Sequence, residues 1–163
     1  IVNSVCGAGD ASYLFQPMED KDEYNLGAHS LQCGRRVDSL KWFLDWKFFG
    51  IEGFARRIET YEALCRYAEE VVLETPELEM VVPRESFNIC FRYAVPEDMA
   101  NAFNLALRTK LYESGVSLVG TGTIGKKLSL RLLIANSSFE KTEVSDWFKG
   151  VVIAGKKLME VWE

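Results

Sequence analysis

Arg131 stands in the middle of an apolar segment, Leu128-Ser129-Leu130-Arg131-Leu132-Leu133-Ile134. The two-residue period of a β-strand places the even-numbered apolar residues of this segment on one face and Ser129 and Arg131 on the other. A guanidinium in such a strand costs free energy unless it is paired, and its planar fork matches a carboxylate. The carboxylate belongs to an acidic side chain of the chain or to a bound molecule. A half-exposed sheet face is a further interpretation.

A second motif, Gly120-Thr121-Gly122-Thr123-Ile124-Gly125, matches the GxGxxG pattern of dinucleotide sites. That pattern binds pyrophosphate only where a helix begins inside the glycine loop. The residues that follow, 126–134, alternate and are rich in leucine, so they predict a strand. We therefore expect the glycines to form a hairpin connection and not a nucleotide site.

Metal and thiol chemistry are not indicated. The chain has four cysteines without CxxC spacing and one histidine, His29, so we expect no metal site. Cys65 falls on an apolar helix stripe and Cys90 within a strand, which predicts buried free thiols in a reducing cytoplasm. Asn88 and Arg92 alternate with apolar residues, and we expect them to lie on an ordinary solvated strand face.

The remaining pattern predicts an α+β protein: two long helices, then a small antiparallel four-stranded sheet with helices on one face. The first helix begins near Asp38 and ends at Gly50, and the second ends at Thr75-Pro76. Later helices begin near Pro96, with a stop at Gly115, and near Lys141. The expected strands are Leu78–Val82, Phe87–Tyr93, Val116–Val119 and Leu128–Ile134.

Composition narrows the classes of function. In 163 residues, 48% hydrophobic content supports a packed core, and a net charge of −5 argues against general nucleic-acid binding. No apolar run has the length of a membrane span, and the chain begins at Ile1 without methionine, which suggests a piece of a longer protein. The first predicted helix carries Trp42, Trp46 and Phe49 in addition to its apolar stripe. Its apolar surface is therefore wider than one stripe, and we expect part of that surface to lie in a larger interface.

The segment Leu31–Lys41 places Arg35 and Arg36 at a helix start, where cations oppose the helix dipole and indicate a bound anion or an acidic partner. Together with Tyr13–Pro17 and Leu130–Asn136, this segment resembles the group II pyridoxal-phosphate-dependent amino-acid decarboxylases, in the branch of glutamate and cysteine-sulfinate decarboxylases. The resemblance runs along nearly the whole chain but matches only the last third of the family's length.

The resemblance implies the C-terminal part of a fold type I pyridoxal phosphate architecture. Residues 1–75 would belong to the end of the large cofactor domain and its link, and residues 76–163 to the small α+β domain. Arg131 matches the family's arginine that holds the substrate's α-carboxylate. Ser30 and Gly34 match a loop that approaches the neighbouring subunit's cofactor phosphate across the dimer interface. Alternatively, Gly34 only lets the chain turn into the helix.

The implied activity is removal of the α-carboxylate of an amino acid, such as glutamate, aspartate or cysteine sulfinate, as CO₂. Pyridoxal 5′-phosphate accepts the electrons left behind. The family's Schiff-base lysine follows a histidine, whereas His29 precedes Ser30. We therefore expect no catalytic residue in this chain and no activity from it alone. The expected partners are the missing N-terminal cofactor-binding region and a second copy in a homodimer. The alternative is a non-catalytic assembly module or a pseudo-enzyme subunit.

Overall fold

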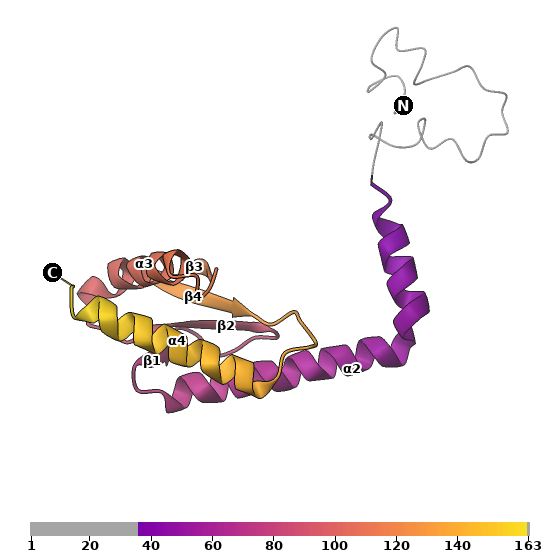
Figure 1. Cartoon of the computed structure of the whole chain (residues 1–163), viewed down its shortest axis with the longest axis horizontal. Helices are drawn as coiled ribbons and strands as arrows, with labels where there is room; N and C mark the ends of the chain where they lie inside the picture. Colours follow the sequence, from indigo (N-terminus) through magenta and orange to yellow (C-terminus); the bar gives the residue numbers. More distant parts are fainter. Residues whose placement is uncertain (1–35, 163) are drawn as a thin grey trace, which may run out of the picture. The chain divides into compact units, whose positions relative to one another are not determined.

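The structure is a computed structural model that describes residues 36–162. The chain divides into two compact units between Phe48 and Phe49. The elements, in chain order, are α2 (Asp38–Glu74), β1 (Leu78–Met80), β2 (Asn88–Tyr93), α3 (Glu97–Glu113), β3 (Gly120–Ile124), β4 (Lys127–Leu133) and α4 (Lys141–Met159) (Figure 1). Among the described residues, no helix combines the length and the apolar character that a bilayer span requires.

Helix α2 is interrupted at Gly50, as the sequence predicts. Gly50 has φ 61° and ψ −177°, a backbone conformation that glycine adopts without steric cost. In the segment before the break, Trp42 and Trp46 are 59% and 43% exposed, and their ring centroids lie 5.7 Å apart. Phe49, the first residue of the second unit, is half-buried, and the Arg57 guanidinium lies over its ring. The predicted larger interface at these aromatic residues stays a prediction.

The four strands form one antiparallel sheet in the order β1-β2-β4-β3, which confirms the predicted fold class. Cys90 of β2 lies opposite Arg131 of β4, and Arg131 lies opposite Gly120 of β3. Because neighbouring residues of paired strands share a face, this register defines two faces of the sheet. The inner face carries Ile89, Phe91, Tyr93, Leu130 and Leu132, and the outer face carries Asn88, Cys90, Arg92, Ser129 and Arg131.

The core lies between the inner face and the helices. Phe91 packs edge-on against Phe148 of α4, with ring centroids 5.3 Å apart, and Tyr93 packs against Phe103 of α3 at 5.4 Å. The second half of α2 adds Cys65, Ala68 and Val72, all fully buried. These contacts place the helices on one face, as predicted, and leave the polar positions of β2 and β4 on the other face.

The third strand differs from its prediction. We predicted a strand over Val116–Val119 and a hairpin connection at the glycines. In the structure the strand β3 is Gly120–Ile124 itself, and of the three glycines of the motif only Gly125 lies in the turn, at φ 61°. The backbone N–H groups of Val116 and Ser117 donate to the carbonyl of Leu111 and so close the end of α3. They are therefore not available for a strand ladder. The predicted division of the chain at residue 75 concerns a complete enzyme and stays a prediction.

Candidate functional site

Arg131 lies on the outer face of β4 with its side chain exposed to solvent. The strand alternation puts its neighbours Leu130 and Leu132 toward the helices, as the sequence predicts. Within residues 36–162, no ion pair or hydrogen bond engages the Arg131 side chain. One interpretation of the sequence was that Arg131 pairs with an acidic side chain of the chain itself. The part of the chain that the structure describes contains no such ion pair.

The two residues directly opposite Arg131 on the neighbouring strands carry no charge and leave it room. Its partner on β2 is Cys90, a half-buried thiol, and its partner on β3 is Gly120. A Cβ placed on Gly120 would stand 3.9 Å from Nε and 4.0 Å from Nη2 of Arg131. The guanidinium thus extends across β3 beside a residue without a side chain. The donor fork remains open to a molecule that approaches the outer face.

Arg92, on the same face, is in the opposite state. Its side chain is only 4% exposed and donates hydrogen bonds to the carboxylates of Glu79 and Glu97. The Glu97 carboxylate, more than that of Glu79, raises the pKa of Arg92 against the effect of burial. Arg92 in turn lowers the pKa of Glu97. The expected solvated strand face is therefore wrong at Arg92, which is buried because two carboxylates satisfy its charge.

A further arginine is also paired within the fold. The guanidinium of Arg84 donates to Glu62 and Glu69 on α2, each at 3.0 Å, and so joins the segment before β2 to that helix. The hydrogen bond to Glu62 is the main reason why the pKa of Arg84 is raised. The guanidinium groups of Arg84 and Arg92 thus both bind carboxylates of the chain itself and stabilise the fold. Arg131, by contrast, has no carboxylate partner within residues 36–162.

Other residues singled out in the sequence are placed as follows. Ser30, Gly34 and His29 lie outside the described residues. Cys65 is buried and Cys90 half-buried, both as free thiols, and burial raises the pKa of the Cys65 thiol. Residues 36–162 contain no cluster of His, Cys, Asp or Glu side chains suited to a metal ion.

The glycine motif offers no helix N-terminus, because β3 continues directly through the Gly125 turn into β4. A nucleotide site of the GxGxxG type needs such a helix start, so the sequence interpretation against nucleotide binding agrees with the structure. Sequence reasoning missed the pairing of Arg92. Only the register, which sets Glu79 opposite Arg92, could have shown it.

The fold, a small antiparallel sheet with helices on one face, is that of part of a fold type I pyridoxal phosphate enzyme. The chain belongs to the pyridoxal-dependent decarboxylase family, since the model of the "Pyridoxal-dependent decarboxylase conserved domain" matches residues 5–94. The match ends one residue after β2, so it includes α2, β1 and β2 and leaves out the rest of the sheet.

Individual relatives give the same result. The chain is 30% identical to an L-aspartate decarboxylase of Metarhizium robertsii over 92% of its length, and 29% identical to the cysteine sulfinic acid decarboxylase of Mus musculus over 94%. The crystal structure of mouse CSAD superposes with a TM-score of 0.77 at 26% identity and covers 86% of this chain. The chain spans about a third of each relative: 31%, 34% and 33%, respectively.

The family's cofactor is pyridoxal phosphate. The only histidine of the chain, His29, precedes Ser30, so the chain contains no His-Lys pair to anchor the cofactor. On the outer face, Arg131 has no acidic partner within residues 36–162.

Proposed function

We propose that this chain is the C-terminal portion of a pyridoxal-phosphate-dependent decarboxylase that removes the α-carboxylate of an amino acid as CO₂. Its role is to bind and orient that carboxylate through Arg131. The observation that carries the proposal is the exposed guanidinium on the outer face, which has no ion pair within residues 36–162. Family membership supports the reaction class.

Orientation is the contribution that a guanidinium can make to such a reaction. Two parallel N–H···O bonds fix both oxygens of a carboxylate and so set the plane and direction of the bond that breaks. The open space beside Gly120 lets the fork take up this geometry without displacing a neighbouring side chain. A lysine at the same position would hold the charge but not the plane.

The substrate is proposed to be an acidic amino acid. The relatives named L-aspartate decarboxylase and cysteine sulfinic acid decarboxylase support this class, because each name specifies a substrate with a second acidic group. The choice among glutamate, aspartate and cysteine sulfinate belongs to groups that contact the substrate's side chain.

The assembly is proposed to be a homodimer of a complete enzyme whose N-terminal region holds the cofactor. The exposed rings of Trp42 and Trp46 support a contact of this kind, since exposed aromatic clusters mark interaction surfaces. Ser30 and Gly34 are proposed to approach the cofactor phosphate across the dimer interface. The free thiols of Cys65 and Cys90 support a cytoplasmic location, where thiols stay reduced.

The test is CO₂ release by the complete protein supplied with pyridoxal phosphate, with aspartate, glutamate and cysteine sulfinate as substrates and leucine as the control. We expect release from at least one acidic substrate, little from leucine, and none from the 163-residue chain alone. A complete protein that binds neither cofactor nor substrate would favour the alternative of an assembly module or pseudo-enzyme subunit. A protein that binds the cofactor but decarboxylates no amino acid would contradict the proposed reaction.

A further inference from the structure

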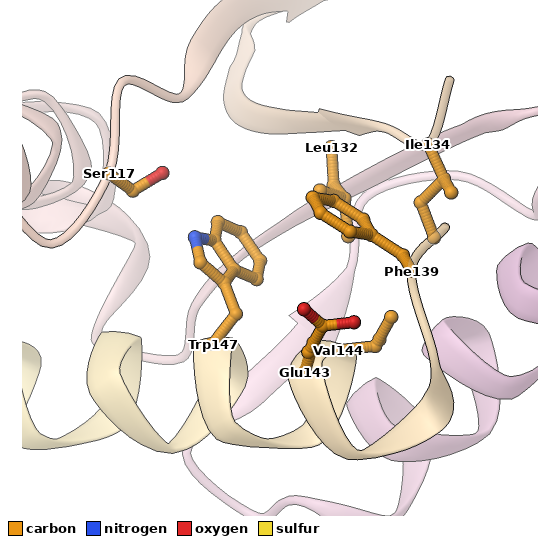
Figure 2. Close-up of a pocket in the computed structure, with 7 residues that line it drawn as sticks. All are labelled: Ser117, Leu132, Ile134, Phe139, Glu143, Val144 and Trp147. Carbon is orange, nitrogen blue, oxygen red and sulfur yellow. The ribbon is translucent and has the colours of Figure 1, made fainter. Parts of the chain in front are cut away.

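A cavity of about 390 Å³ opens on the helix side of the sheet, between the end of β4, the start of α4 and the segment after α3 (Figure 2). Leu132 contributes to its wall from the inner face of β4, whereas the neighbouring Arg131 lies on the outer face. The cavity is therefore separate from the candidate carboxylate site. Its lining residues are Ser117, Leu132, Ile134, Phe139, Glu143, Val144 and Trp147.

Local hydrogen bonds hold the connection from β4 to α4 at the rim of this cavity. Asn136 accepts the backbone N–H of Ser138 on its side-chain oxygen, and its carbonyl accepts the backbone N–H of Phe139. The Glu143 carboxylate accepts the backbone N–H of Glu140 at 2.8 Å, in a capping box that begins α4. These bonds fix the backbone of the connection that carries Phe139 and of the helix start that carries Glu143.

The walls are apolar and rigid. Ile134 and Val144 are 2% and 5% exposed, respectively, so they belong to the packed core. The Trp147 ring stands edge-on to Phe91 and Phe148, with centroid distances of 5.8 Å and 4.9 Å. Such ring contacts fix the indole without filling the cavity. A preformed apolar cavity with few polar groups is the usual form of a small-molecule site, and 390 Å³ lies in the range of such sites.

The polar lining groups of the cavity are Glu143, Ser117 and the indole nitrogen of Trp147. Figure 2 shows the Glu143 carboxylate between the Trp147 and Phe139 rings, with the indole nitrogen turned toward the side where Ser117 lies. One carboxylate oxygen is used by the Glu140 N–H. Within residues 36–162, the Ser117 hydroxyl and the indole N–H form no hydrogen bond, and no basic side chain is ion-paired with Glu143.

The nearby lysines are directed elsewhere. Lys141 lies over the Tyr67 ring, 5.0 Å from its centroid, and Lys149 pairs with Asp146 at 2.7 Å. The opening of the cavity therefore carries the negative charge of Glu143 next to two aromatic rings. That combination attracts an organic cation through its ammonium group and an apolar body through the walls.

We propose that this cavity binds a small primary amine, with the ammonium group at Glu143 and the apolar chain against Leu132 and Val144. The inference is independent of the proposed decarboxylase function, because the cavity lies on the face of the sheet opposite to Arg131. The probe is n-hexylamine, with n-hexanol as the neutral analogue and hexanoate as the anionic one. Binding is followed by the shift of the Trp147 indole signal in ¹H–¹⁵N spectra of the unmodified chain.

We expect hexylamine to bind about fivefold more tightly than hexanol, as one partly exposed charge contact provides, and hexanoate to bind most weakly. Glu143→Gln should reduce this preference to less than about twofold, because glutamine keeps the cap but loses the charge. Asp146→Asn is the matched control: it removes a carboxylate of the same helix that does not line the cavity, and the preference should persist. Ser117→Leu should weaken both ligands by narrowing the opening.

Equal binding of hexylamine and hexanol to the unmodified chain would overturn the charge assignment. An unchanged Trp147 signal up to the solubility limit of hexanol would overturn the site as a whole. In the complete protein, loss of hexylamine binding that the isolated chain shows would mean that another segment occupies the cavity, and this too would contradict the proposal. These measurements need no variant, so they decide the question even if a substitution disturbs folding.

Discussion

Methionine substitutions at Arg92 and Arg131 compare two arginines of the same sheet face to which the structure gives opposite roles. The Arg92 side chain is 4% exposed and is bound by two carboxylates. Arg131 is exposed and has no such partner within residues 36–162. Methionine keeps most of the aliphatic length of arginine and removes the charge, so the pair of variants isolates the contribution of each guanidinium to folding.

The magnitude follows from what each variant leaves behind. Arg92→Met removes charge-assisted hydrogen bonds to Glu79 and Glu97, whose side chains are 44% and 63% exposed and so regain water. The cost should therefore fall below that of a fully buried pair, at roughly 2–3 kcal/mol. For a chain of this size, that loss lowers the unfolding midpoint by about 5–10 °C. Arg131→Met should change stability by less than about 0.5 kcal/mol.

The assay is urea unfolding of the three proteins at pH 7, followed by circular dichroism and tryptophan fluorescence, with thermal unfolding as a second measure. Coincident transitions by both probes would justify a two-state analysis. A loss of 2 kcal/mol or more from Arg131→Met, on the scale that buried ion pairs reach, would refute the assignment of Arg131 to a ligand and indicate an internal partner. An unchanged midpoint for Arg92→Met would refute the structural role of Arg92.

Two further predictions concern packing and pH. A Cβ on Gly155 would stand 2.1 Å from the buried Tyr93 ring, so Gly155→Ala should destabilise the fold by roughly 1–3 kcal/mol. On the same helix, a Cβ on Gly150 would stand 3.2 Å from the exposed Val116 side chain, which has room to move, so Gly150→Ala should change stability by less than about 1 kcal/mol. Thermal unfolding that ranks the two variants in the reverse order would contradict this. Arg92 lowers the pKa of Glu97 below its ordinary value of 4.5. The ion pair between Glu97 and Arg92 therefore contributes its full stabilisation of the folded state above pH 4.5, and this stabilisation is lost as the pH falls below that value and Glu97 takes up a proton. Urea midpoints between pH 7 and pH 3 should therefore fall less steeply for Arg92→Met than for the unmodified chain, and parallel curves would contradict the linkage.

Local signals in the sequence were sufficient for the helices. Gly50 and Gly115, both at positive φ, end helical segments where predicted, and the apolar stripe of the second half of α2 is buried at Cys65, Ala68 and Val72. The strand alternation around Arg131 also gave the correct face. These features depend on residues close together in the chain, so propensity and periodicity determine them.

Non-local pairing was beyond such reasoning. Strand β3 contains Gly120 and Gly122, which disfavour a strand in isolation, but its backbone pairs with β4 along its whole length. Arg92 is paired with Glu79, 13 residues before it, and Glu97, five residues after it, an arrangement that exists only once β1 lies beside β2. The cavity at Trp147 likewise requires the packing of β4 against α4.

The central claim, that Arg131 binds the substrate's carboxylate, is tested most directly by steady-state decarboxylation in the complete enzyme, with cofactor occupancy measured in parallel. Arg131→Ala should retain the cofactor and lose about 30- to several thousand-fold in kcat/KM, the equivalent of roughly 2–5 kcal/mol. Arg131→Lys should recover little, because a point charge does not reproduce the two parallel hydrogen bonds of the fork. An Arg131→Ala enzyme with full cofactor occupancy and near-normal kcat/KM would contradict the account.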